Sequence, residues 1–277
     1  MRIKHHIGGN EKTDKIKKQF DKLNIKYKET MNIITADIYE DDKNWSEIQQ
    51  LIIQKKLTDM IEKVFSKKEL KESKWLKLRS GWYWDYPKPD YDMEYRKITY
   101  KDSNYCIECG SGLIQTAPFR LKSEPKWGNK AILQLNWVYD ELFIKSELYN
   151  QLIALGFSGI SSQKVINNQN DDVLKSVFQL NIEKKLLPGL IKDKNNIEPY
   201  ICNSCGITKY QYNPKQIISY KSEAFSDASD FNKTSELFGA KDNKISIPFI
   251  IVSNKVYNFF EENKWKQPIF EPLSLVE

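Results

Sequence analysis

Two short cysteine motifs constrain the fold of this chain more than any other feature. All four cysteines lie in two CxxCG segments, Cys106–Gly110 and Cys202–Gly206. Two residues between the cysteines let one tight turn present both sulfurs to the same ion, and glycine adopts the positive φ that such a turn favours. Zinc(II) prefers a tetrahedron of four such ligands. The sequence therefore predicts one structural zinc ion, bound by Cys106, Cys109, Cys202 and Cys205.

The spacing of the two motifs leaves other interpretations open. Between Cys109 and Cys202 lie 92 residues, whereas a compact zinc ribbon has roughly 15–20 at this point. One shared site is still compatible with this spacing, since the loop-closure cost grows only logarithmically with length. Redox-active pairs are an alternative, although neither motif follows a clear strand and opens a clear helix as a thioredoxin-like motif does. Disulfides and two unrelated metal fragments are the others.

The composition is that of a globular protein. The chain has 277 residues, 40% of them hydrophobic, which is enough for one large domain or two ordinary ones. No apolar run approaches the roughly 18 residues that a membrane span needs. The first fifteen residues also lack the apolar stretch of a secretory signal. These features predict a cytoplasmic location and no membrane partner.

The positive charge is concentrated near the N-terminus. Residues 1–80 hold 19 Lys and Arg against 13 Asp and Glu, which accounts for the whole net charge of +6. Residues 81–277 hold 24 of each sign. An excess of this kind favours an acidic partner, either protein or nucleic acid, although a lysine-rich solvated surface is the simpler interpretation.

The sequence lacks the groups that common catalytic schemes require. Its two histidines, His5 and His6, are adjacent and lie near the N-terminus, which argues against a Ser–His or Cys–His nucleophile. Neither is needed as a zinc ligand beside four cysteines. The zinc-deaminase pattern, the P-loop and the GxGxxG motif are absent from the sequence. We therefore expect a protein that is not an enzyme.

Residues 1–97 are predicted to form an N-terminal α+β segment. Apolar residues at helical spacing indicate one helix after Asn10 and another from Trp45. The β-branched stretch Asn32–Tyr39 indicates a strand. Ser66 and Glu69 fit a capping box that opens a further helix.

Residues 81–92 interrupt this pattern with two prolines and a dense aromatic cluster. We interpret them as a connecting loop that packs across the two halves of the chain with large apolar side chains. The alternative is base stacking, since lysine and arginine residues alternate with Trp75, Trp82 and Trp84.

Residues 98–277 are predicted to form a β-rich domain that contains a zinc ribbon and an internal pseudo-repeat. Strands followed by an amphipathic helix come after each CxxCG motif, with the helices at Ser146–Leu152 and Ser253–Phe260. Two copies that each donate half of a metal site would form a pseudo-twofold arrangement, and a chance match of short motifs is the alternative. The segments expected to be extended are Ile98–Tyr105, Leu113–Leu121, Ala131–Leu135, Val173–Ile182, Gln216–Tyr220 and Ile247–Val252.

A C-terminal run consists of Phe225, Ser229–Phe231, Glu236–Gly239, Phe249–Ser253, Val256 and Ile269–Pro272. Together with the two CxxCG motifs, this run resembles the bacterial double-CxxCG motif family, which is similar to immunity-type proteins of polymorphic toxin systems. The resemblance covers about residues 100–277. It implies that the four cysteines hold a metal and that the protein binds and neutralises a cognate toxin. Toxin-contacting residues do not carry over, because immunity surfaces differ between members.

A non-enzymatic cytoplasmic binding protein of the immunity type is thus the leading functional prediction. The alternative is a zinc-ribbon protein that binds nucleic acid through the basic N-terminal third and the aromatic loop. A structural or phage-associated component is a third class. Nucleic-acid binding would weaken steeply as salt rises, whereas a toxin interface with a hydrophobic centre would weaken less.

Overall fold

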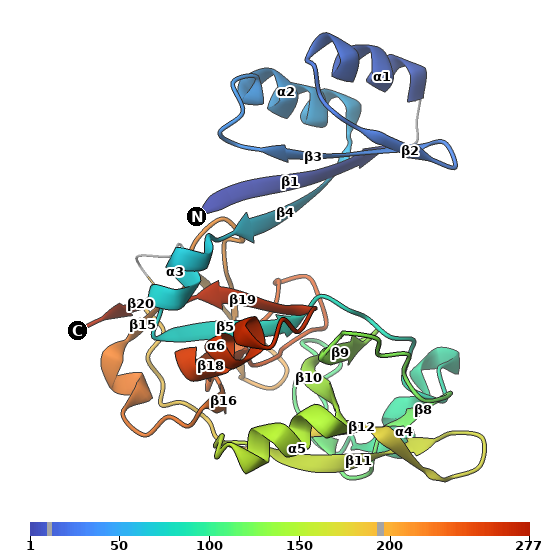
Figure 1. Ribbon diagram of the computed structural model, residues 1–277, viewed down its shortest axis with the longest axis vertical. Helices are drawn as coiled ribbons and strands as arrows, with labels where there is room; N and C mark the ends of the chain where they lie inside the picture. Colours follow the sequence, from blue (N-terminus) through green and yellow to red (C-terminus); the bar gives the residue numbers. More distant parts are fainter. Residues whose placement is uncertain (10–12, 193–196) are drawn as a thin grey trace. The chain divides into compact units, whose positions relative to one another are not determined.

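The computed structural model describes residues 1–9, 13–192 and 197–277 as an α+β protein with two compact units (Figure 1). One unit comprises Met1–Glu69 and the short segment Pro214–Gln216, and the other comprises the rest of the chain. This division differs from the predicted boundary near residue 97. The reason is strand β5 (Trp75–Ser80), which pairs with two strands from the C-terminal part of the second unit, β18 and β19. No helix in the described ranges is long and apolar enough to cross a membrane.

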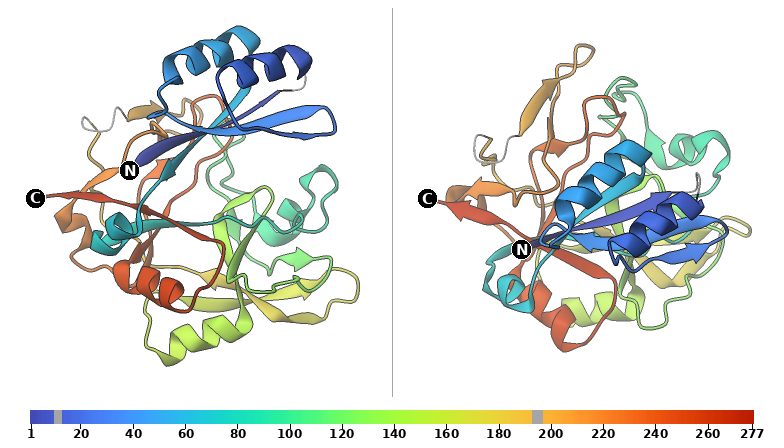
Figure 2. Two further views of the ribbon diagram at one scale, coloured as in Figure 1. Left: turned by 45° about the horizontal axis from the view of Figure 1, so that its top comes forward. Right: turned by 90° about the horizontal axis from the view of Figure 1, so that it is seen from above.

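The first unit is a split β-α-β sandwich of the ferredoxin-like type. Its antiparallel sheet has the order β2-β3-β1-β4. Helix α1 follows β1, helix α2 follows β3, and both helices cover the same face of the sheet (Figure 2). The bounds are β1 (Arg2–Gly9), α1 (Thr13–Lys22), β2 (Lys28–Thr30), β3 (Ile33–Tyr39), α2 (Trp45–Lys55) and β4 (Thr58–Val64).

Alternating burial along β3 explains this packing. Strand β3 buries every second residue, so that one side of the strand meets the helices and the other does not. Helix α1 buries Ile16 and Phe20 against this side, and α2 buries Ile48. The strand and both helices that the sequence predicted here are confirmed. The predicted capping box also forms, since Glu69 N–H donates to Ser66 Oγ at 3.2 Å at the start of α3 (Lys67–Glu72).

The second unit is built on two larger sheets. The five-stranded sheet has the order β8-β11-β12-β10-β9 and is antiparallel except between β8 and β11. Its strands are β8 (Arg120–Leu121), β9 (Ile132–Leu135), β10 (Val138–Lys145), β11 (Ser161–Asn167) and β12 (Val173–Asn181). The four-stranded sheet, in the order β16-β18-β5-β19, adds β16 (Phe231–Lys233), β18 (Ile250–Ser253) and β19 (Pro268–Pro272) to β5.

Both faces of the five-stranded sheet are buried. One face contributes Leu142 and Ile144 to a core shared with the four-stranded sheet. The opposite face contributes Phe143 and Val177 to a second core. The two predicted helices of this unit form as α5 (Ser146–Ala154) and α6 (Asn254–Glu262), and both pack into the first core.

The predictions of extended structure met with mixed success. Ala131–Leu135 and Val173–Ile182 contain β9 and β12 as expected. The prediction for Ile98–Tyr105 is wrong, because this stretch begins inside helix α4 (Tyr95–Thr99) and continues only into the short strand β6 (Tyr100–Lys101). Tyr95 and Thr99 are both buried and stand four residues apart, which is the spacing of one helix face.

The aromatic loop packs within the second unit. Trp82 contacts Trp84 and Trp127 edge to face, with ring centroids 5.5 and 5.4 Å away. Trp82 and Trp84 both pack against the second core. Exposed rings of this part of the chain are Tyr83 and Tyr91. The described contacts of the two tryptophans therefore agree with a packing role.

Candidate metal centre

The structure brings the four cysteine sulfurs into one cluster, all within 4.8 Å of one another. Cys106 Sγ lies 3.6 Å from Cys202 Sγ, and Cys109 Sγ lies 3.6 Å from Cys205 Sγ. A zinc ion with bonds of about 2.3 Å to four tetrahedral sulfurs separates those sulfurs by about 3.8 Å. The cluster thus has the size that one metal ion requires.

Each CxxCG segment is the turn of a small antiparallel hairpin. The first lies between β6 and β7 (Ile114–Gln115), and the second lies between β13 (Glu198–Ile201) and β14 (Thr208–Gln211). Neither segment opens a helix. The arrangement therefore lacks the strand-to-helix turn that a thioredoxin-like cysteine pair uses.

The two turns share the same backbone hydrogen bonds. The glycine N–H donates to the carbonyl of the first cysteine at 2.8 Å in both segments, from Gly110 to Cys106 and from Gly206 to Cys202. The N–H of the first cysteine donates to the carbonyl of the residue five positions later at 2.9 Å in both, from Cys106 to Ser111 and from Cys202 to Ile207. Gly110 has a φ of 78° and Gly206 a φ of 74°. The positive φ that the sequence predicted for both glycines is confirmed.

The thiols of the cluster differ in their readiness to ionise. Burial raises the pKa of Cys109, but hydrogen bonds from the hydroxyl and backbone N–H of Ser111 and from neighbouring thiols outweigh it, and the pKa falls to about 6. For Cys106, backbone N–H groups lower the pKa, while burial and the adjacent Cys205 and Cys202 raise it to about 11. Once one thiolate forms, its neighbours resist further negative charge. A divalent cation removes that resistance, so the donor set fits a metal ion.

A loop from the C-terminal part of the chain supports the first turn. Ser246 Oγ donates to the carbonyl of Cys109 at 2.7 Å. Lys209, which is 0% exposed, donates from Nζ to the carbonyl of Asn243 at 2.6 Å. A Cβ placed on Gly110 would lie 2.0 Å from the carbonyl oxygen of Lys244. Sequence reasoning missed these supporting residues, because an isolated lysine or serine carries no local signal of burial.

The two histidines do not belong to this cluster. His5 is 2% exposed, and its ring nitrogens lie 2.8 Å from Asp59 Oδ1 and 3.0 Å from Glu40 Oε1. His6 Nδ1 lies 2.5 Å from Asp37 Oδ1. The group of potential metal ligands found among the described residues consists of the four cysteines alone.

The C-terminal run defined above is mostly internal. Asp230 Oδ1 accepts a hydrogen bond of 2.7 Å from Ser253 Oγ, which joins two parts of the run. The Phe238 and Phe249 rings stack with centroids 3.9 Å apart. Glu236 Oε1 accepts from Gly189 N–H at 2.9 Å. These contacts hold the second unit together.

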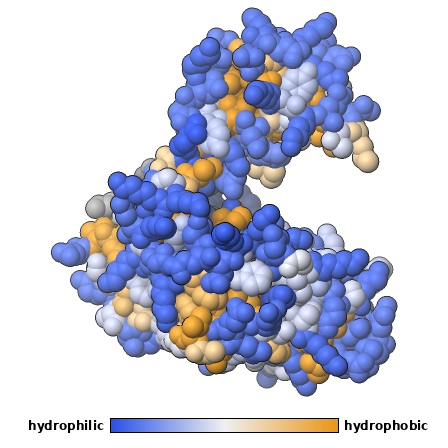
Figure 3. All heavy atoms as spheres, viewed as in Figure 1, coloured by the Kyte–Doolittle hydropathy of each residue, from blue (hydrophilic) through white to orange (hydrophobic). Residues whose placement is uncertain are grey.

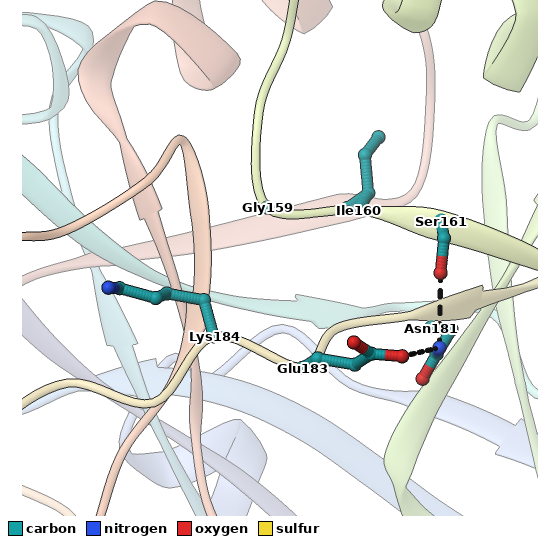
Figure 4. A pocket seen from close by; sticks show the side chains of 6 residues that line it. All are labelled: Gly159, Ile160, Ser161, Asn181, Glu183 and Lys184. Atoms are coloured by element: carbon teal, nitrogen blue, oxygen red, sulfur yellow. Dashed lines mark hydrogen bonds between the residues drawn. The ribbon is translucent and has the colours of Figure 1, made fainter.

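The molecule also has an open pocket of about 460 Å³ away from the cysteines (Figure 4). Asn181 Nδ2 donates to Ser161 Oγ at 3.0 Å and to Glu183 Oε1 at 2.7 Å. Three polar side chains that line the pocket are therefore hydrogen-bonded to one another. On the face drawn in Figure 3, hydrophobic residues appear in small groups among hydrophilic ones.

No protein-family model matches the sequence, and a search of the curated proteins gives no match.

Proposed function

We propose that the four cysteines hold one structural zinc ion. The observation that carries this proposal is the convergence of four thiol sulfurs, from two hairpin turns, within 4.8 Å. A set of four thiolates suits zinc or iron–sulfur chemistry and does not suit magnesium or calcium. With all four positions filled by protein, zinc has no open position for a substrate. When bound, the ion would cross-link the two hairpins and stabilise the second unit.

We further propose that the chain is a non-enzymatic binding protein that neutralises a cognate bacterial toxin in the cytoplasm. Support comes from the double CxxCG motif together with the C-terminal run. The internal contacts of that run, such as Asp230 with Ser253, give the run a role in the fold. Recognition of a toxin is then left to exposed residues, which agrees with surfaces that differ between members.

Ion pairing in the first unit occupies part of the positive charge that the nucleic-acid alternative would use. Arg2 pairs with Asp41 at 2.7 Å, Lys4 with Glu62 at 2.5 Å, and Lys17 with Glu29 at 2.8 Å. Lysine and arginine side chains that are already paired offer less to a phosphate backbone, whose binding depends on free positive charge. The packed tryptophans Trp82 and Trp84 also offer little ring surface for base stacking.

Metal analysis tests the first proposal. The full chain is purified without added metal, and its zinc and iron are measured per chain by elemental analysis. About one zinc per chain is expected. Protein free of zinc, or protein with iron in its place, would overturn the zinc assignment.

Co-expression tests the second proposal. The chain is expressed together with a toxin gene from beside its own gene, and growth and complex formation are measured. Restored growth, with a complex that survives 0.5 M salt, is expected. Unchanged toxicity without a complex would argue against immunity, and binding to DNA or RNA that weakens steeply with salt would favour the nucleic-acid alternative.

A further inference from the structure

A small pocket lies beside the first cysteine turn, entirely within the second unit. Its volume is about 110 Å³. The turn contributes Gly110 and Gly112, helix α4 contributes Arg96, and the supporting loop contributes Lys244. Pockets for whole drug-sized ligands measure about 300–1,000 Å³. This pocket therefore admits only a small chemical group.

The Arg96 guanidinium in this pocket lacks a carboxylate partner among the residues that the structure describes. It is half-buried, and its Nη1 donates to the Tyr105 hydroxyl at 3.2 Å. Its Nε lies 3.5 Å from the Tyr95 hydroxyl. Both partners are neutral, so neither hydrogen bond pairs the guanidinium with a negative charge. A planar guanidinium in this situation matches a carboxylate or a phosphate, which it can bind through two parallel hydrogen bonds.

Tyr100 supplies a neutral donor to the same pocket. Burial raises the pKa of its phenol, and the nearby carboxylates of Asp140 and Glu141 raise it further. The hydroxyl therefore keeps its proton at neutral pH. Within the described part of the chain it makes no hydrogen bond, so it is available to donate to an anion.

The charge of Asp140 selects among anions. Asp140 lines the pocket, and its carboxylate makes no hydrogen bond or ion pair among the described residues. Its negative charge opposes a doubly charged phosphate about twice as strongly as a singly charged carboxylate. Together with Arg96 and Lys244, it leaves one net positive charge among the lining residues.

We propose that this pocket binds a single carboxylate group, held by the Arg96 guanidinium and the Tyr100 hydroxyl, with Lys244 at its rim. The carboxylate is borne either by an acidic side chain of a partner protein or by a small free acid. The proposal does not depend on the identity of a toxin. Because Gly110 and Gly112 form part of the wall, the metal centre shapes the pocket without touching its ligand.

Arginine side-chain NMR tests the site directly. The chain has four arginines, Arg2, Arg79, Arg96 and Arg120, so the Nε–Hε resonances of the zinc-loaded full chain are few and can be assigned by substitution. Propionate, the side-chain acid of glutamate, is titrated, with propionamide as the neutral control of the same shape. A saturable shift confined to Arg96, seen with propionate and not with propionamide, is expected. No shift at Arg96, equal shifts with both probes, or a shift with inorganic phosphate only would overturn the proposal.

A capped glutamate, acetyl-glutamate methylamide, distinguishes the two sources of carboxylate. Binding of both the capped glutamate and propionate supports the proposal with a protein side chain as the source. Binding of propionate alone supports it with a free acid as the source.

Two substitutions with opposite effects complete the test. Arg96→Gln should abolish the saturation by propionate, whereas Asp140→Asn should tighten propionate binding about threefold or more, because it removes a like charge. Arg120→Gln is the matched control, since Arg120 pairs with Asp171 and does not line this pocket. If Arg96→Gln does not fold, Asp140→Asn alone decides, and unchanged or weaker binding in that variant contradicts the proposal.

Discussion

The sulfur of Cys106 lies 3.6 Å from the sulfur of Cys202, 96 positions further along the chain. Cys109 and Cys205 repeat the same distance over the same separation. Both short contacts join one hairpin turn to the other, so neither turn forms the site alone. A metal ion here would close a long loop of chain, and its loss should affect the whole second unit.

Replacing Cys202 with Ser should release the metal and destabilise the second unit. Three remaining sulfurs bind zinc poorly, and the binding energy of a structural zinc ion is folding energy, on the order of 10 kcal/mol in small zinc domains. Elemental analysis and thermal unfolding check this expectation. Ser204→Ala, an exposed change within the same turn, should keep the full metal content. Cys202→Ser with normal metal content and normal thermal stability would contradict a shared site.

The two glycines of the turns offer a matched pair of substitutions. Both have positive φ, so alanine costs about 1 kcal/mol at either position. At Gly110 the new Cβ would also lie 2.0 Å from the carbonyl oxygen of Lys244, whereas at Gly206 nothing lies within 4 Å. Gly110→Ala should therefore lower the free energy of unfolding by clearly more than Gly206→Ala, and it should displace the loop that supports Cys109. Denaturant titration of both variants measures the difference, and equal losses would refute the close approach.

Local patterns allowed the prediction of the parts of this molecule that depend on neighbouring residues. The tight turns require cysteine and glycine at fixed positions, and α1, α2, α5 and α6 each present an apolar face. Grouping all four cysteines also needed only the preference of zinc for four ligands.

Features that depend on distant residues escaped prediction. The sequence of strand β1 has no apolar pattern that would identify a strand, because it includes Lys4 and His6. Their partners Glu62 and Asp37 lie on other strands. A lysine such as Lys77 is usually exposed, but Lys77 is buried in β5, and its Nζ lies 3.1 Å from Glu271 Oε2. Such pairings form only once strands far apart in the chain become neighbours, so no local pattern reveals them.

His5 should matter for the first unit far more than His6. His5 is 2% exposed, its ring centroid lies 4.3 Å from that of Trp45, and its ring nitrogens lie between Asp59 and Glu40. His5→Ala would leave a cavity and two carboxylates without this partner, a loss of about 2–4 kcal/mol.

His6→Ala is the control, because the His6 side chain is 43% exposed and its pair with Asp37 is worth roughly 1 kcal/mol or less. Hydrogen exchange of the β1 and β3 amides, with denaturant unfolding, compares the two variants. Similar losses in both would show that the buried position of His5 is not what stabilises the sheet.

Asp230 should make the stability of the second unit depend on pH. Burial raises the pKa of its carboxyl, but hydrogen bonds from Ser253 and Ser158 and the charge of Lys255 lower it more, so the folded pKa lies below the usual 3.8. A depressed pKa contributes stability that is present above the unfolded value and is lost as pH falls through the folded value. Asp230→Asn should therefore lower the free energy of unfolding by about 1–2 kcal/mol at pH 7, and the gap to the unsubstituted protein should narrow below about pH 3.8.

Urea titrations at intervals from pH 7 to pH 3 measure that gap, with Asp227→Asn as the matched control. The Asp227 side chain is 86% exposed and pairs with Lys184 at the surface, so its loss should cost less than about 0.5 kcal/mol at every pH. Asp230 differs because it links Ser158, in the segment after α5, to Ser253, the last residue of β18 directly before α6. A gap that stays constant down to pH 3, or an equal effect of the two substitutions, would mean that the carboxylate of Asp230 does not stabilise this junction.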